Sequence, residues 1–273
     1  MKKRSLMQRL LGAPYILWAA IFIIVPLIIV VYYSFTDSAG NFTLDNIKGL
    51  AGYKDIFLIS IEYSLIATVI TLLISYPFAY IMSRKKDSTQ RIMMMLVMLP
   101  MWMNLLIRTY SWMNILEKNG IINNFLALIG IEPLKMIGTP GAVIFGMIYN
   151  YIPYMILPIY SVMAKIEPSL LEAAEDLGSN GFSKLRRIIL PLSMPGVVSG
   201  FTMVFVPSVS TFYISQKLGG KIMLVGDAIE KQIQSLYNYN LGAALSLVLM
   251  VLILISMALM KKFAGDSGDN ILV

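Results

Sequence analysis

Long apolar runs alternate with short polar segments along this chain, and each run is long enough to cross a bilayer. A spanning helix needs about 17–25 mostly apolar residues. Five such runs carry no charge, and a sixth is interrupted only by Arg108. Trimmed at their ends, the runs predict six transmembrane helices near residues 12–35, 62–83, 92–116, 140–164, 193–215 and 240–261. We therefore expect an all-α integral membrane protein that forms a single domain over residues 1–273.

The composition supports this interpretation and disfavours an enzyme. Of 273 residues, 58% are hydrophobic and 14% charged, whereas soluble domains carry about 25% charged residues. The chain has no Cys and no His, which removes thiolate metal sites, Cys nucleophiles and the usual proton shuttle. We expect a non-catalytic subunit without a metal or a cofactor of its own. Its net charge of +7 does not indicate nucleic acid, because in a membrane protein the location of the charges matters more than their sum.

The distribution of Lys and Arg predicts the orientation. With six spans, the side that holds both termini and the second and fourth loops carries fourteen of these residues, and the opposite loops carry seven. Because basic residues accumulate on the inner side, both termini are expected in the cytoplasm of a multi-pass inner-membrane protein. The N-terminal MKKRSLMQRL also resembles a signal peptide. Its apolar run exceeds the usual 7–15 residues, so an uncleaved first span is favoured.

The densest polar segment lies between the fourth and fifth predicted spans, at residues 165–192. Its pattern predicts a helix, a turn and a second helix. Pro168 suits a first helical turn, and Gly178 is placed for a left-handed helix cap. The second helix is expected over Phe182–Leu190 and should stop at Pro191. This segment is predicted to face the cytoplasm.

The same segment has two faces, which leaves two interpretations open from the residues alone. Leu170, Ala174 and Leu177 recur at helical spacing on one side. Lys184 and the following arginines make the second half basic. Such a segment could lie on the membrane with its basic half near anionic lipid. It could equally be held by a soluble partner.

A resemblance favours the second interpretation. The segment reads Glu-Ala-Ala, three residues, Gly, nine residues, Ile, one residue, Leu-Pro. It resembles the signature loop of ABC importer permeases at every specified place. The matching residues are Glu172, Ala173, Ala174, Gly178, Ile188, Leu190 and Pro191. In that family the loop is a coupling helix that docks on an ATP-hydrolysing subunit. The resemblance implies that Glu172 contacts this partner, that the two alanines allow close packing, and that Gly178 makes the turn.

The energy source must lie outside this chain. It contains no GxxxxGK[ST] phosphate-binding loop. ATP and Mg are therefore expected on the partner ATPase.

The resemblance extends over most of the chain and narrows to permeases of spermidine/putrescine importers, of the first-permease type. It is carried by the stretches 99–112, 146–161, 190–200 and 205–229. It implies a second homologous permease, a dimer of ATP-binding subunits and an extracytoplasmic polyamine-binding protein as partners. Permeases for sulfate and ferric iron share relatives of these motifs, so another small solute is the alternative. A membrane scaffold or receptor without transport is a more distant one.

A polyamine path should offer aromatic faces inside the membrane and carboxylates at its mouth. Each cation–π contact contributes roughly 0.5–2 kcal/mol, which guides a polycation without trapping it. The candidates for the substrate pathway are Trp102, Tyr110, Tyr149, Tyr154 and Tyr213, with Glu62 and Asp227 near the outer face. Tyr and Trp also form belts at both membrane interfaces, so each aromatic has a structural explanation as well.

Arg108 is the one charge in the interior of the predicted spans, because Glu62 and Lys261 lie at span ends. An intramembrane charge costs roughly 2.5–3.5 kcal/mol at the helix centre and is a functional candidate by default. Arg108 lies towards the outer end of its span, where it could snorkel or pair with Glu117 or Asp227. We favour a structural or gating role. If Arg108 lined the pathway, an anionic substrate such as sulfate would be favoured instead.

Overall fold

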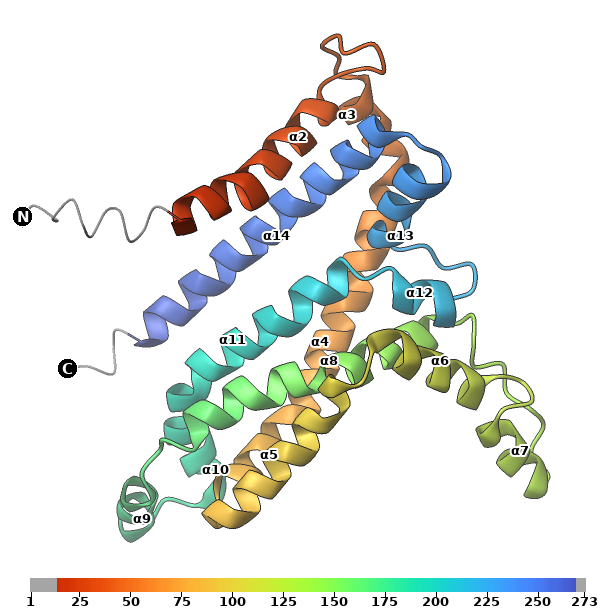
Figure 1. Ribbon diagram of the computed structural model, residues 1–273. Helices are drawn as coiled ribbons and strands as arrows, with labels where there is room; N and C mark the ends of the chain where they lie inside the picture. The colour runs from red at the N-terminus through yellow and green to blue at the C-terminus, as the bar shows by residue number, and fades with distance from the viewer. Residues whose placement is uncertain (1–13, 269–273) are drawn as a thin grey trace, which may run out of the picture. The chain divides into compact units, whose positions relative to one another are not determined.

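The computed structural model describes the backbone of residues 14–268, and that part of the chain is helical (Figure 1). Within it no strand forms, and an isolated bridge pairs Thr36 with Phe42. The predicted all-α class is confirmed. The described residues fall into two compact units, one of residues up to Asp55 with Ala228–Val251, and one of Ile56–Asp227 with residues from Leu252 onwards.

Five helices in the described residues are long and apolar enough to cross a membrane. They run over Pro14–Ser34, Asp45–Ser83, Pro140–Met163, Gly181–Val209 and Tyr239–Lys262. A sixth crossing arises if the bent pair Asp87–Trp102 and Leu105–Leu128 is one broken span. The helices therefore support a multi-pass membrane protein.

The third predicted span, 92–116, is divided into α5 (Asp87–Trp102) and α6 (Leu105–Leu116). The axes bend by 89° at the break. Pro100 lies in the last turn of α5, and the Asn104 side chain accepts a hydrogen bond from the Leu106 N–H at 2.7 Å. Asn is a preferred helix N-cap because its side chain satisfies one of the unpaired N–H groups of a first turn. A single polar residue thus begins a new helix inside an apolar run.

In the first unit, side-chain amides hold the loops at the end of α2 (Val25–Ser34). The Nδ2 group of Asn46 in α3 (Asp45–Gly49) donates to the Thr36 carbonyl oxygen at 2.9 Å. Asn240, at the start of α14 (Tyr239–Gly268), donates to the same oxygen at 2.6 Å. Two residues distant in sequence thereby satisfy one backbone carbonyl that follows the end of α2.

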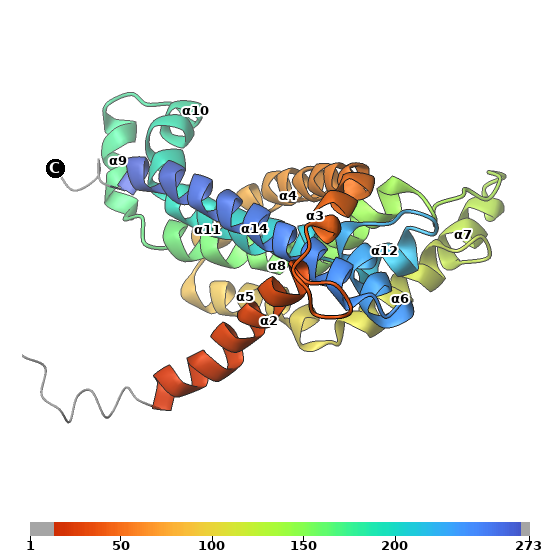
Figure 2. The same cartoon turned by 90° about the horizontal axis from the view of Figure 1, so that it is seen from above.

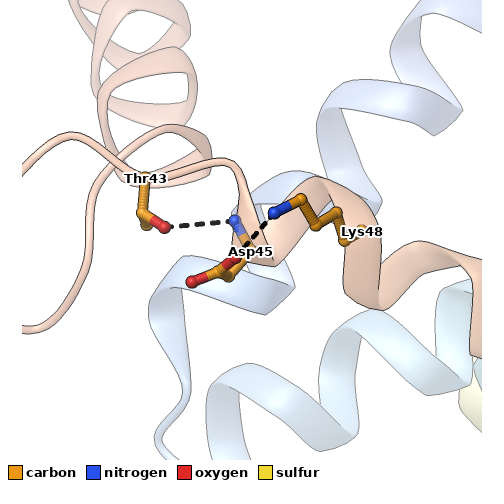
Figure 3. Close-up of polar contacts among 3 residues, drawn as sticks. All are labelled: Thr43, Asp45 and Lys48. Carbon is orange, nitrogen blue, oxygen red and sulfur yellow. Dashed lines mark hydrogen bonds and ion pairs between the residues drawn. The ribbon is translucent and has the colours of Figure 1, made fainter.

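The start of α3 shows how a short helix is begun locally (Figure 3). The N–H of Asp45 donates to the Thr43 hydroxyl at 3.1 Å, and Lys48 Nζ lies 3.3 Å from Asp45 Oδ1. The acid in the first turn and the base in the last suit the helix dipole. Both side chains are exposed, so the ion pair itself contributes little.

The second unit is organised around α8 (Pro140–Met163) and α11 (Leu190–Val209), which lie side by side in both views (Figures 1 and 2). A methyl group on Gly196 would lie 2.8 Å from the Pro158 carbonyl oxygen, and one on Gly200 would lie 2.8 Å from Met155 Sδ. Small residues of this kind let membrane helices approach closely, which gains van der Waals contact. The two glycines thus set the distance between the two helices.

The fifth predicted helix begins earlier than expected and passes through Pro191. A helical turn α10 (Gly181–Lys184) continues through a π-helical turn at Leu185–Ile189 into α11. The predicted stop at Pro191 is wrong. The Leu190 N–H bonds the Leu185 carbonyl, five residues back. This wider turn, with proline near the start of the following α-helix, accommodates a residue that lacks an N–H.

Candidate functional site

The polar segment between α8 and α10 contains a tight reversal of the chain. After α9 (Pro168–Asp176), Gly178 has a φ of +80°. Its N–H donates to the Glu175 carbonyl at 2.8 Å, and the Ser179 N–H donates to the Ala174 carbonyl at 2.9 Å. These two bonds form a Schellman motif, so the predicted left-handed cap is confirmed. Nothing lies within 4 Å of a Cβ built on Gly178, so backbone conformation rather than space requires glycine.

The second arm of the segment is capped and then tied to the first. The Asn180 Oδ1 accepts the Ser183 N–H at 2.8 Å, which caps α10. Lys184 forms an ion pair with Glu175 in α9. In both views α9 and α10 lie close together beyond the ends of α8 and α11 (Figures 1 and 2). The two arms therefore form a small helical hairpin.

This hairpin exposes large apolar side chains. Leu177 is 87% exposed, Phe182 70% and Leu170 45%. Ala174 alone of the predicted apolar face is buried, at 8%. Apolar side chains gathered on an exposed element are typical of an interaction site. The face predicted for Leu170, Ala174 and Leu177 is thus mostly free for a partner.

The other residues of the sequence motif lie along the same hairpin. Glu172 and Ala173 are exposed on α9. Ile188 is half-buried in the π-helical turn, and Leu190 and Pro191 are exposed at the start of α11. The motif residues therefore extend from the tip of the hairpin to the first turn of a long apolar helix.

The base of the hairpin is attached to the loop between α4 (Lys54–Ser83) and α5. Arg84 Nη2 donates to the Met163 carbonyl at 3.1 Å, and its Nη1 donates to the Ile166 carbonyl at 3.2 Å. The Tyr160 hydroxyl donates to Gln90 Oε1 at 2.6 Å. The guanidinium satisfies carbonyls at the C-terminal end of α8, where a positive charge is favourable. The loop after α4 is thus hydrogen-bonded to the end of α8 and to the segment that leads into α9.

The aromatic candidates form separate pairs. The ring centroids of Tyr110 and Tyr213 lie 6.1 Å apart, and Tyr149 lies 5.1 Å from Trp112. Tyr154 contacts Tyr151 at 6.4 Å. All three pairs have edge-to-face geometry, which suits the ring quadrupoles. Trp102 is 77% exposed at the end of α5, beside the break in the third predicted span.

A lysine lies over the first of these pairs. Lys217 Nζ is 5.0 Å from the Tyr110 ring centroid and 5.6 Å from that of Tyr213. Lys217 and Tyr213 are four residues apart on α12 (Tyr213–Leu218), so their side chains share a face. A hydrogen bond with the Tyr110 hydroxyl raises the pKa of Lys217 above its usual value. The ammonium group is therefore held charged between two tyrosines.

The charged candidates lie in different environments. Glu62 is exposed on α4, whereas Asp227 is 6% exposed and accepts the Leu224 N–H at 2.8 Å at the start of α13 (Val225–Glu230). Arg108 is 7% exposed, and its Nε and Nη1 have no hydrogen-bond partner in the described part of the chain. The pathway roles of Glu62 and Asp227 and the structural or gating role of Arg108 stay predictions.

No cluster of three or more metal-binding side chains exists among the described residues.

A known protein family matches a stretch of the chain that includes both the hairpin and several of the long apolar helices. Residues 75–265 match the family described as "Binding-protein-dependent transport system inner membrane component". This match covers more than half of the chain. The chain belongs to this permease family.

Curated relatives are similar to the permease over most of its length. The protein named "Spermidine/putrescine transport system permease protein PotB" from Haemophilus influenzae is 40% identical over 246 residues, with 86% of each chain covered. The protein of the same name from Escherichia coli K12 is 36% identical, covering 86% of this chain and 89% of its own. The resemblance seen in the sequence to permeases of the spermidine/putrescine type is thereby confirmed.

Solved structures share the fold of the permease. A bacterial ABC transporter described as importing the acidic polysaccharide alginate matches with a TM-score of 0.75 at 18% identity, over 94% of this chain and 95% of its own. A second alginate transporter structure, in complex with a pentasaccharide-bound periplasmic protein, matches with a TM-score of 0.77 at 17% identity, over 94% and 93%. At this level of identity the likeness concerns the fold alone.

Sequence reasoning missed three residues of the permease that these contacts bring forward. The sequence pattern predicts no contact for these residues, which are Arg84, Gln90 and Lys217. Arg84 carried one usable signal, because it directly follows an apolar helix and long basic side chains often satisfy helix-end carbonyls. For Lys217 the signal was the Tyr-x-x-x-Lys spacing, which puts a ring and an ammonium on one helical face.

Proposed function

We propose that this chain is a transmembrane permease subunit of an ATP-driven importer that moves spermidine and putrescine into the cytoplasm. The observation that carries the proposal is 36–40% identity to proteins named as spermidine/putrescine permeases, over 86% of the chain. Because the solved neighbours also cover 94% of the chain, residues 1–273 are proposed to act as one permease domain.

The exposed hairpin of α9 and α10 is the proposed dock for a partner ATPase. Leu177 and Phe182 would enter an apolar cleft on that subunit, and Glu172 would contact its rim. Ala173 would permit close approach because it has no side chain beyond Cβ, and the buried Ala174 would keep α9 against its own chain. Gly178 holds the reversal that presents both arms. Ile188, Leu190 and Pro191 would connect the hairpin to α11.

Coupling would follow from the attachment of this hairpin to long helices. Closure of a pair of ATP-binding subunits, with ATP and Mg bound there, would push the hairpin. The displacement would pass through the helical continuation into α11 and through Arg84 to the end of α4. The permease helices would then shift from an inward-facing to an outward-facing arrangement, as in alternating access. The chain itself is proposed to be non-catalytic.

The remaining partners follow from the importer proposal. A second homologous permease would complete the pathway, and an extracytoplasmic polyamine-binding protein would deliver the substrate. Fourteen basic residues on the side of the hairpin against seven opposite support cytoplasmic termini. The aromatic pairs formed by Tyr110, Tyr149, Tyr154 and Tyr213, together with the exposed Trp102, suit a substrate with spaced ammonium groups. Glu62 and Asp227 are proposed to attract the cation at the outer side.

Uptake by the reconstituted complex tests the proposal. The permease is co-expressed with the ATPase, second permease and binding protein of its own system and placed in liposomes. Radiolabelled spermidine, putrescine and sulfate are offered with and without ATP. ATP-dependent uptake of a polyamine that unlabelled sulfate or ferric iron does not reduce is the expected result. A complex whose ATPase lacks the phosphate-loop lysine is the matched control.

Two outcomes would contradict the proposal in different ways. Uptake of sulfate in place of polyamines would keep the importer and change its cargo, and it would favour Arg108 as a pathway residue. Uptake of no solute despite ATP hydrolysis and full assembly would favour a scaffold or receptor. Either result is read against the same control complex.

A further inference from the structure

The two tyrosines that converge on Lys217 form a partly open aromatic site. Tyr110 comes from α6 and Tyr213 from α12, and Tyr110 is 42% exposed. Their rings meet edge to face with centroids 6.1 Å apart. Lys217 Nζ lies within about 6 Å of both centroids, the range in which a cation is attracted to a ring face. The site is thus built for a cation and holds one of the protein's own.

The backing of this site is rigid. Ile214 and Leu218, the residues that directly follow Tyr213 and Lys217 on α12, are fully buried in one cluster with Val143 and Met147 of α8. A methyl group on Gly146 would lie 2.6 Å from a methyl carbon of Leu218, so α12 packs directly on α8. α12 therefore holds Tyr213 in place, whereas the flexible stem of Lys217 can move without disturbing the core.

The group that occupies the site has the chemistry of the proposed substrate. A lysine side chain is four methylene groups ending in a primary ammonium. The aminobutyl end of a polyamine is also four methylene groups ending in a primary ammonium. A pair of rings that accepts the first has the size and polarity to accept the second.

Both groups cannot occupy the site together. Two ammonium ions at this distance repel each other, and each exposed cation–π contact favours occupancy by only about two- to fivefold. A tethered group competes with a free ligand because the tether keeps its effective concentration high, in the mM range for a short flexible link. Lys217 thus occupies the site reversibly, and a polycation at a comparable concentration can compete with it.

We infer that Tyr110 and Tyr213 form a binding site for the terminal primary ammonium of the transported polycation, and that Lys217 occupies this site until the substrate displaces it. The inference rests on the proposed polyamine cargo. Displacement would leave the Lys217 ammonium in water and the substrate ammonium between the rings.

Amine labelling of the complete complex in lipid nanodiscs tests the displacement. A brief pulse of acetic anhydride is applied with saturating spermidine or with NaCl of equal ionic strength, and acetylation is read by mass spectrometry. Lys221 is exposed, belongs to the same loop and serves as the internal reference, which corrects for reagent consumed by spermidine. We expect spermidine to raise the ratio of Lys217 to Lys221 labelling at least about threefold, from the loss of two cation–π contacts.

A variant and an uptake assay separate the possible failures. In Tyr110→Leu the ratio should be high without spermidine and should not rise further, because one ring of the site is gone. If the wild-type complex transports spermidine but the ratio does not change, the inference is overturned and the proposed function stands. If the wild-type complex transports no polyamine, the proposed function is wrong, and the inference that rests on it is overturned with it. A rise of equal size in Tyr110→Leu would also overturn the inference.

Discussion

The guanidinium of Arg84 donates a 3.1 Å hydrogen bond to the carbonyl oxygen of Met163, the last residue of α8. This bond connects the loop after α4 to the base of the α9–α10 hairpin. A second bond from Arg84 reaches Ile166, two residues before α9 begins. Motion of the hairpin can therefore reach two apolar helices, α4 through Arg84 and α11 through the continuous chain.

Replacing Arg84 should weaken coupling more than assembly. Arg84→Gln removes two charge-assisted hydrogen bonds, each of which contributes about 1.5–3 kcal/mol. We expect ATP hydrolysis to continue while the amount of substrate imported per ATP falls several-fold. The measurement is simultaneous phosphate release and uptake in proteoliposomes.

The neighbouring lysine provides the control for this prediction. Lys85 is exposed, and Lys85→Gln removes the same charge from the same loop. It should leave the ratio of uptake to hydrolysis unchanged. Equal loss in both variants would mean that the loop acts through its charge and not through the contact of Arg84 with α8.

Gly178→Ala should strain the reversal of the hairpin without any steric clash. An L-residue in the left-handed region costs roughly 1–2 kcal/mol. Gly178→Asn should cost less, because Asn tolerates this conformation. We expect hydrogen exchange over residues 165–192 to be fastest in Gly178→Ala, intermediate in Gly178→Asn and slowest in the wild type. Uptake should be lowest in Gly178→Ala and highest in the wild type. Gly181→Ala is the matched control, since Gly181 has space for a Cβ and no positive φ.

Contact with a partner can be separated from the shape of the hairpin. Phe182 is 70% exposed, so Phe182→Asp should leave the free permease intact and reduce co-purification of the ATPase. A buried central anchor of an interface typically contributes 2 kcal/mol or more, which corresponds to about thirtyfold in affinity. Ser179→Asp, next to the turn, introduces the same charge without removing an apolar side chain. Unchanged co-purification with Phe182→Asp would contradict the proposed dock.

Local chemistry in the sequence was sufficient for the features that depend on neighbouring residues. Gly178 was identified as a left-handed cap because a helical pattern ends there and glycine alone enters that conformation without cost. The apolar lengths likewise predicted the helical class. These features need no knowledge of the rest of the chain.

The sequence predicted helix ends less well where two local signals oppose each other, such as an apolar run that contains a helix-capping residue. Hydropathy continues through Asn104, yet its side chain caps a new helix and divides the third predicted span. Pro191 was expected to end a helix, but a preceding π-helical turn lets the helix continue. The contacts of Arg84 with Met163 and of Lys217 with Tyr110 join residues about 80 and 107 positions apart, and no local pattern predicts such pairs.

Gly196→Ala should lower the stability of the permease. Its Cβ would lie 2.8 Å from the Pro158 carbonyl oxygen and 3.0 Å from the Ile159 Cα, and neither backbone atom can move easily. Overpacking of this kind costs about 1–3 kcal/mol. We expect a lower thermal midpoint in detergent, read by intrinsic fluorescence. Gly141→Ala in the first turn of α8, where the nearest atom is 3.9 Å away, should have little effect.

The charge state of Lys217 should depend on the Tyr110 hydroxyl. A hydrogen bond with this hydroxyl raises the pKa of Lys217 above its ordinary value, so the ammonium form is favoured in the folded protein. The stabilisation is fully present below the unfolded pKa and is lost as the pH rises through the higher folded value. Tyr110→Phe keeps the ring and removes the hydroxyl. Only the neutral amine is acetylated, and at a pH near 9.5 a measurable fraction of the lysine side chains is neutral. The ratio of Lys217 to Lys221 acetylation should therefore be higher in Tyr110→Phe than in the wild type. A slower or unchanged rate would show that the ring alone, and not the hydroxyl, holds the ammonium.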